Sequence, residues 1–135
     1  MQQPIPTDTR FTLVVYDTGE AARLAQRFAA AAISAGLAIE QIFFYYSGVH
    51  EADANRALAQ DDPMPVIPWP DLAASGNFSL NVCIAAGARR GILNSGEARR
   101  LDKPAANLDP AFELVGLGVL LEGMTNADRL VTFDN

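Results

Sequence analysis

The chain has 135 residues, half of them hydrophobic, which suits one compact domain that buries its own core. Sixteen acidic residues against ten basic ones give a net charge of -6, and this argues against a surface built for direct nucleic-acid binding. One cysteine and one histidine exclude an internal disulfide, a Cys-x-x-Cys redox pair and most multi-histidine metal sites, so we expect neither a metal nor a cofactor.

The N-terminus predicts a soluble, intracellular chain. Residues 1–9 contain two prolines and are expected to form a flexible lead-in, and residues 10–135 are expected to form a single domain. The lead-in has no basic or apolar stretch of the kind found in secretion signals, and no apolar run approaches about 18 residues. With one unpaired thiol, this favours a cytoplasmic location and no membrane contact.

The first third of the chain has a β-α-β pattern. Residues 11–16 form a nearly continuous apolar run, which is typical of a buried strand. Apolar residues then recur at helical spacing over residues 21–32, with Thr18 as a candidate N-cap and Gly36 as a stop. Residues 39–46 predict a second strand, which short loops would place parallel to the first.

The rest of the chain continues the alternation. Residues 50–60 predict a short helix, and residues 61–70, with four prolines, predict a loop. The later elements are expected as a strand over 78–85, a helix over 85–90 ending at Gly91, a helix over 95–101 capped by Ser95, a strand over 112–115, a helix over 117–125 that Gly118 and Gly123 weaken, and a strand over 128–133. The sum is an α/β domain of three layers, in which a mainly parallel sheet of four to five strands carries helices on both faces.

Cys83 is the main candidate for chemistry, because functional groups of such sheets gather at the carboxyl ends of strands. It closes the third strand, small residues follow it, and the next helix would direct its N-terminal amides toward the sulfur. These amides, with Arg89 and Arg90, would favour the nucleophilic thiolate. The alternative is a buried cysteine that serves as a small core residue, and position alone favours that alternative.

Other polar residues have weaker claims. Arg89 and Arg90 fit a solvated helix end as well as an anion site. His50 would tune a thiol or act as a base, and a lone loop histidine is more often surface. Asp17 ends the first strand, where it binds a ligand or caps a turn.

Two further groups of residues have the composition of possible sites. Gly116-Leu117-Gly118 lacks the third glycine of a dinucleotide fingerprint, which argues against a nucleotide site. Tyr45, Tyr46 and Trp69 fit a partner surface or the core.

The motif Asn81-Val82-Cys83-Ile84-Ala85-Ala86-Gly87-Ala88-Arg89-Arg90-Gly91 resembles the cysteine motif of the DsrE/TusD family of sulfur-relay proteins. The resemblance departs from that motif at Gly87, where alanine is expected. Three segments support it by their order: residues 43–50, 112–118 and 128–133. It covers about residues 10–133 and implies a DsrE-like fold.

The resemblance implies a sulfurtransferase that carries sulfane sulfur as a persulfide on Cys83. It implies a TusA-like donor, a DsrC/TusE-like acceptor, and use of the sulfur in 2-thiolation of the tRNA wobble uridine or in sulfur oxidation. It further implies a hetero-hexamer with paralogous DsrF/DsrH (TusC/TusB)-like subunits, with a homo-oligomer as the alternative. Two other functions remain open: a structural subunit of such a complex with an inert Cys83, and a flavodoxin-like module that binds a small ligand.

Overall fold

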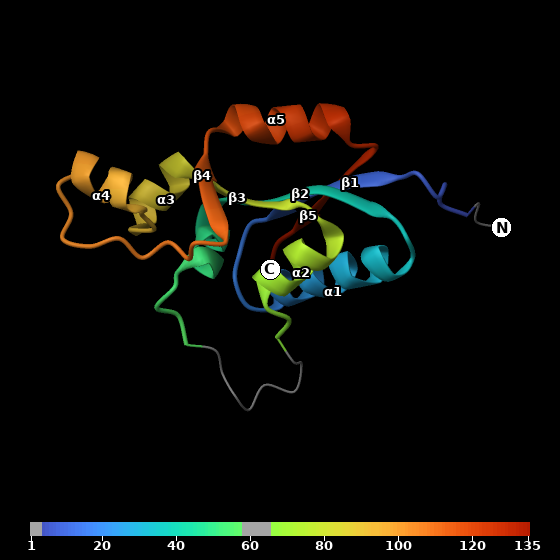
Figure 1. The fold of residues 1–135 in the computed structure, drawn as a ribbon, viewed down its shortest axis with the longest axis horizontal. Helices are drawn as coiled ribbons and strands as arrows, with labels where there is room; N and C mark the ends of the chain where they lie inside the picture. The colour runs from blue at the N-terminus through green and yellow to red at the C-terminus, as the bar shows by residue number, and fades with distance from the viewer. Residues whose placement is uncertain (1–3, 58–65) are drawn as a thin grey trace.

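The computed structural model describes residues 4–57 and 66–135, and its centre is a five-stranded sheet (Figure 1). The strands are β1 (Arg10–Val15), β2 (Ala38–Phe44), β3 (Ser79–Cys83), β4 (Phe112–Val115) and β5 (Arg129–Phe133). They lie in the order β4-β3-β2-β1-β5, and all four neighbouring pairs are parallel. The predicted α/β class with a mainly parallel sheet is confirmed.

Helices cover both faces of this sheet, as expected. Among the described residues they are α1 (Glu20–Ser34), α2 (Trp69–Gly76), α3 (Ile84–Arg90), α4 (Ser95–Arg100) and α5 (Leu117–Asn126), with a 3₁₀ helix, η1, at Tyr46–Ala52. Figure 1 shows α5 above the sheet, α1 and α2 below it, and α3 and α4 beyond the carboxyl ends of the strands. None of these helices combines the length and apolar character needed to cross a bilayer.

Strands β1 and β2 are buried because helices pack on both of their faces. Every residue of β1 after Arg10 is buried, as are the last four residues of β2. The face of the sheet that α1 and α2 cover is packed with apolar side chains. An example is the edge-on pair of Phe44 and Trp69, whose ring centroids lie 5.0 Å apart.

The opposite face holds α5 through buried polar contacts. The Thr12 hydroxyl donates to the Gly123 carbonyl at 2.9 Å, and the Gln41 side-chain amide donates to the Val119 carbonyl at 3.2 Å. Asn81 in turn donates to the Gln41 side-chain oxygen at 2.7 Å. The three inner strands, β1, β2 and β3, thus contribute one polar residue each. The strand register places all three side chains on the face of the sheet that α5 covers.

Two of the predicted helix caps are wrong. Thr18 does not cap α1: Gly19 occupies the N-cap position at φ 68, and the Asn135 side chain accepts a 2.9 Å hydrogen bond from the Ala21 amide. Ser95 is the first residue of α4 and does not cap it. The Asn94 side chain takes that role by accepting from the Glu97 amide at 2.9 Å.

The segment between β2 and β3 differs most from the prediction. The short helix expected over 50–60 is instead the earlier 3₁₀ helix η1, residues 53–57 are not helical, and residues 58–60 lie outside the described ranges. Of the proline loop predicted over 61–70, residues 61–65 lie outside the described ranges, residues 66–68 are in no helix or strand, and the last two residues already belong to α2, which begins at Trp69. Its Pro70 stands in the first helical turn, where proline is tolerated.

The remaining element predictions are confirmed within a few residues at their ends. Strand β2 stops at Phe44, before the predicted end at residue 46, and β3 stops at Cys83, before residue 85. Gly91 ends α3, as predicted. It adopts a left-handed conformation at φ 74, which glycine reaches without steric cost.

Candidate functional site

Cys83 lies at the carboxyl edge of the sheet, where the sequence places it. It is the last residue of β3 and the N-cap residue of α3, with φ -61 and ψ 117. The strand therefore turns directly into the helix at the sulfur-bearing residue. The first backbone amides of α3 follow Cys83 immediately, and no side chain caps them.

The thiol is nevertheless covered in the single chain. Cys83 is only 2% exposed and belongs to the buried apolar cluster. Of the two interpretations of Cys83, a reactive thiol at the sheet edge and a buried core residue, the exposure of the residue in the single chain fits the second. Of the small residues that follow, Ala86 and Gly87 are buried as well, and Ala85 is exposed.

The strand register shows what flanks Cys83. On one side Cys83 pairs with Val115 of β4. On the other side, Phe43 pairs with Asn81, so the extended Tyr45, two residues beyond Phe43, lies beside Cys83. Since Asn81 faces α5 through Gln41, Cys83 faces the same side.

The row continues toward the other edge of the sheet. Val15 pairs with Phe44, which sets Tyr16 beside Tyr45, and the two ring centroids lie 6.0 Å apart. Val15 also pairs with Phe133, which sets Asp134 beside Tyr16. We name the residues Cys83, Tyr45, Tyr16 and Asp134 the carboxyl row.

A pocket opens at the far end of this row, with a volume of about 450 Å³. Its lining residues are Tyr16, Asp17, Tyr46, Ser47, Arg90, Thr132 and Asp134, and we name it the tyrosine pocket. The Tyr16 and Tyr46 ring centroids are 5.5 Å apart. Tyr46 is 54% exposed, and it is one of few non-glycine residues at positive φ in the described ranges.

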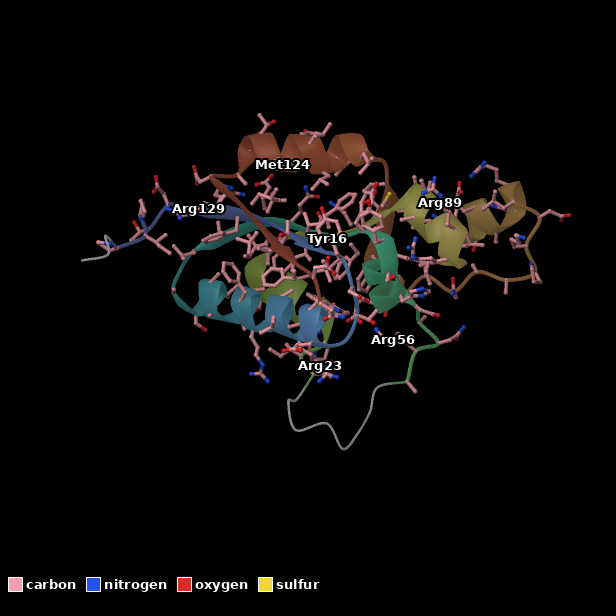
Figure 2. The ribbon with its side chains drawn as sticks, turned by 180° about the vertical axis from the view of Figure 1, so that it is seen from behind. Tyr16, Arg23, Arg56, Arg89, Met124 and Arg129 are labelled. Atoms are coloured by element: carbon pink, nitrogen blue, oxygen red, sulfur yellow. The ribbon has the colours of Figure 1, made fainter. Side chains whose placement is uncertain are left out.

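The basic candidates lie on two elements near the carboxyl edge, α3 and η1. Arg89 and Arg90 lie in the last turn of α3, six residues or more from Cys83, which is about 9 Å along a helix. Arg89 is exposed and lies on α3 beyond the sheet (Figure 2), and Arg90 lines the tyrosine pocket. His50 is half-buried in η1, which packs against α3. A role for these residues toward the sulfur stays a prediction.

Two other candidates are settled by their contacts. Asp17 accepts a 2.8 Å hydrogen bond from the Thr18 amide, so it caps its turn as well as lining the pocket. Trp69 is buried and donates from its indole nitrogen to Glu51 at 3.0 Å. Of the three aromatic residues weighed as a partner surface, Trp69 belongs to the core and Tyr46 is exposed.

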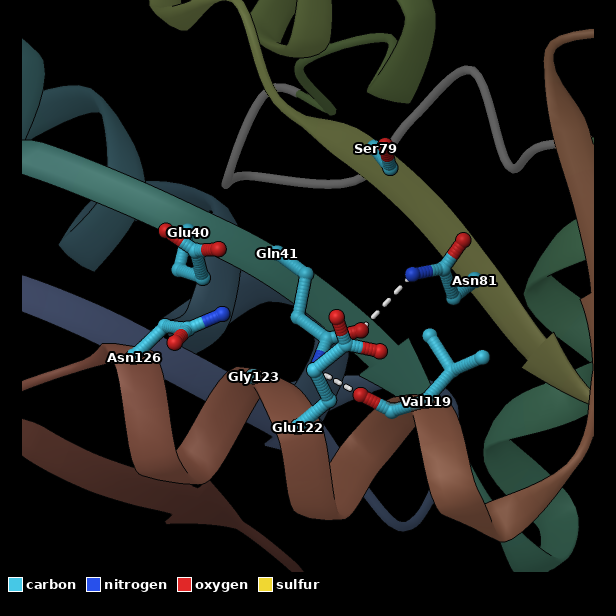
Figure 3. A pocket seen from close by; sticks show the side chains of 8 residues that line it. All are labelled: Glu40, Gln41, Ser79, Asn81, Val119, Glu122, Gly123 and Asn126. Atoms are coloured by element: carbon cyan, nitrogen blue, oxygen red, sulfur yellow. Dashed lines mark hydrogen bonds between the residues drawn. The ribbon is translucent and has the colours of Figure 1, made fainter.

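A second, smaller pocket of about 200 Å³ lies under α5, away from the carboxyl edge (Figure 3). Glu40 and Glu122 stand at its mouth, and the buried amides of Gln41 and Asn81 form its floor. Figure 3 shows Gln41 joining Asn81 to the Val119 carbonyl. These contacts mark the pocket as part of the attachment of α5 to the sheet.

Comparisons with known proteins agree with this geometry. The DsrE/DsrF-like family matches residues 10–133. A sulfurtransferase TusD homolog of Pseudomonas aeruginosa is 44% identical over 126 residues, which are 92% of this chain and 96% of that protein. A sulfurtransferase TusD of Cronobacter sakazakii is 40% identical, over 92% of this chain and 99% of its own. A putative sulfurtransferase DsrE of Allochromatium vinosum is 42% identical, over 84% and 88%.

A solved structure confirms the fold. The crystal structure of the ychN protein from E. coli superimposes with a TM-score of 0.57 at 15% identity, over 93% of this chain and 99% of that one. The parallel sheet with a cysteine at its carboxyl edge defines a DsrE-like α/β protein. The chain belongs to the DsrE/DsrF-like family, and its curated relatives confirm the predicted enzyme class, a sulfurtransferase.

Proposed function

We propose that this chain is a sulfur-relay subunit that carries sulfane sulfur as a persulfide on Cys83. The observation that carries the proposal is the place of Cys83, at the carboxyl edge of the sheet and directly before α3, in a family whose relatives are sulfurtransferases. Cys83 is also the single cysteine of the chain, and persulfide transfer needs one reactive sulfur per subunit.

The chemistry is an exchange in two steps. The Cys83 thiolate attacks the outer sulfur of a donor persulfide, the donor's S–S bond breaks, and the donor leaves as a thiolate. An acceptor thiolate then attacks the outer sulfur on Cys83, and Cys83 leaves as a thiolate in its turn. Each thiol gives its proton to solvent, and no electrons are gained or lost overall.

The first turn of α3 supports the anionic form of this sulfur. Its backbone amides follow Cys83 directly, and unpaired amides at a helix start stabilise a negative charge close to them. Arg89 and Arg90, in the last turn of α3, and His50, in η1, are supporting candidates.

The burial of Cys83 sets a condition on the reaction. A residue that is 2% exposed reacts with a visiting thiol only when the carboxyl edge opens or a partner rearranges it. We therefore propose that the donor and acceptor proteins, of TusA type and DsrC/TusE type respectively, bind at this edge and give access to the thiol when sulfur is exchanged. A cytoplasmic location accords with this, because a reducing setting keeps the thiol free.

Assembly and pathway complete the proposal. The outer face of α5 exposes Leu117, Leu121 and Met124 at helical spacing, and this apolar stripe supports assembly with paralogous subunits into a hetero-hexamer, or with further copies of this chain. The pathway served is tRNA wobble-uridine thiolation or sulfur oxidation, since relatives named TusD and DsrE match the chain to a similar degree.

The second candidate is a structural subunit whose Cys83 is inert, and the burial of the residue favours it. One experiment separates the two. The chain is incubated with a TusA-type persulfide donor, and intact-mass and peptide mass spectrometry follow. The first candidate predicts a gain of one sulfur atom on Cys83 that Cys83→Ser abolishes while circular dichroism stays unchanged. An unmodified wild-type chain, under conditions in which a control thiol protein is loaded, supports the structural subunit.

A further inference from the structure

The tyrosine pocket lies close to Cys83 and has a chemical character of its own. Neighbouring strands are about 4.8 Å apart, so Tyr16, two strands from Cys83, lies about 10 Å away along the carboxyl row. Asp134, on the next strand, lies about 14 Å away. A protein segment in the pocket could therefore reach the sulfur within the same contact.

The lining of the pocket favours a positive charge. Asp17 and Asp134 contribute two carboxylates, against the single guanidinium of Arg90. The rings of Tyr16 and Tyr46 stand 5.5 Å apart, and tyrosine rings attract cations over their faces. The chain as a whole carries a charge of -6, which steers a basic partner toward it.

The Tyr46 ring is exposed to solvent at the pocket. Tyr46 is 54% exposed and is held at φ 44, a conformation that non-glycine residues rarely adopt. Large exposed aromatic rings beside a cavity are typical anchors of protein interfaces. Tyr45, the neighbour of Tyr46, packs against Phe43, with ring centroids 6.1 Å apart, and is only partly exposed.

We infer that the tyrosine pocket binds a basic side chain of the protein segment that exchanges sulfur with Cys83. This inference rests on the proposed function for its partner and adds the recognition element. The distance between the pocket and Cys83 sets the separation of the two residues in the partner. An extended chain spans about 3.3 Å per residue, so four residue steps cover about 13 Å. The basic side chain therefore stands about four residues from the reacting cysteine of the partner.

The test uses two synthetic peptides, acetyl-Arg-Gly-Gly-Gly-Cys-amide and the same peptide with Glu in place of Arg. Cys83 is loaded with sodium polysulfide and desalted, and the transfer of sulfur to each peptide is followed by mass spectrometry. The peptide thiolate attacks the outer sulfur, and Cys83 is released as a thiolate. The Arg peptide should react about fivefold faster, and high salt should reduce the difference.

Matched variants locate the effect. Asp17→Asn and Asp134→Asn should each reduce the preference for the Arg peptide. Glu122→Gln, an equal change of charge at an exposed residue of α5 away from the tyrosine pocket, should leave the preference intact. Equal rates for the two peptides, or a preference that survives in both pocket variants, would overturn the inference while leaving Cys83 as the sulfur carrier.

A second measurement does not depend on sulfur loading. Cys83→Ser labelled with ¹⁵N is titrated with acetyl-Arg-Gly-Gly-Gly-Ser-amide and with its Glu counterpart. The Arg peptide should shift the amide signals of residues 16–17, 46–47 and 134, and the Glu peptide should leave them in place. Shifts confined to other residues, or equal shifts with both peptides, would contradict the inference even if Cys83 proves inert.

Discussion

Tyr45, the first residue after β2, lies beside Cys83, the last residue of β3, on the face of the sheet that α5 covers. The register pairs Phe43 with Asn81, two residues before each of them. The Tyr45 ring also lies near both Tyr16 and Tyr46, with centroids 6.0 Å and 4.6 Å away. Tyr45 is therefore the link between the thiol and the tyrosine pocket.

Removal of the Tyr45 ring should expose the sulfur. In Tyr45→Ala we expect Cys83 to react with a maleimide about tenfold faster, the factor that roughly 1.4 kcal/mol of local stability gives. Tyr45→Phe keeps the ring and should react at the wild-type rate. Equal rates for the two variants, both folded by circular dichroism, would show that another group covers the thiol.

Gly87 should tolerate no side chain. A Cβ placed there would lie 2.8 Å from the Ile92 carbonyl oxygen, and the Gly87 carbonyl accepts the Ile92 amide at 2.8 Å. We expect Gly87→Ala to lower the free energy of unfolding by about 1–3 kcal/mol in urea titrations. Gly118→Ala is the control, because nothing lies within 4 Å of its Cβ, and it should raise stability by up to about 1 kcal/mol. An unchanged free energy of unfolding in Gly87→Ala would show that the turn after α3 adapts to the added methyl group.

The buried contacts of Gln41 should be costly to remove. Gln41→Met leaves the Val119 carbonyl and the Asn81 amide without their partner, and should lower the free energy of unfolding by about 1–3 kcal/mol. Hydrogen exchange of α5 amides should accelerate in parallel. Glu113→Met, an exposed change on the same face, should alter stability by less than about 0.5 kcal/mol. Unchanged exchange in α5 would argue that apolar contacts hold the helix.

Asn135 should stabilise the start of α1 from the far end of the sequence. Its side chain accepts from the Ala21 amide at 2.9 Å and donates to the Thr18 carbonyl at 3.1 Å. We expect Asn135→Ala to lower the free energy of unfolding by about 0.5–2 kcal/mol. Thr18→Ala should change it by less than about 0.5 kcal/mol, since the Thr18 side chain caps nothing. If Thr18→Ala lowered the free energy of unfolding more than Asn135→Ala does, Thr18 would be the cap of α1 after all.

The elements were predictable where a local pattern determines them. Apolar runs marked β1 and β2, helical spacing marked α1, and Gly91 marked the end of α3, because each signal lies within the segment that it describes. Helix α2 was missed because prolines stand at and before its start, and the sequence does not separate a first-turn proline from a loop.

The site was predictable only in part. Cys83 was placed correctly at the end of β3, since a strand followed by small residues and a helix is a local signal. Its burial, its neighbour Tyr45 and the cap from Asn135 depend on pairings between distant segments. The register between strands creates these three features, and it cannot be predicted from the spacing of residues along the sequence. Gly123 is similar: it weakens α5 by propensity, yet a Cβ there would lie 1.9 Å from the Gln41 side-chain nitrogen.

That close approach links two distant parts of the molecule. Helix α5 starts one residue after β4, at the same edge as Cys83, and it is clamped to the sheet near its other end at Gly123. A Cβ at position 123 would meet the end of the Gln41 side chain, so either Gln41 gives up the Val119 carbonyl or α5 shifts on β1 and β2. In both cases a change in the last part of the helix would weaken the hold of the whole helix on the sheet, up to its start beside β4.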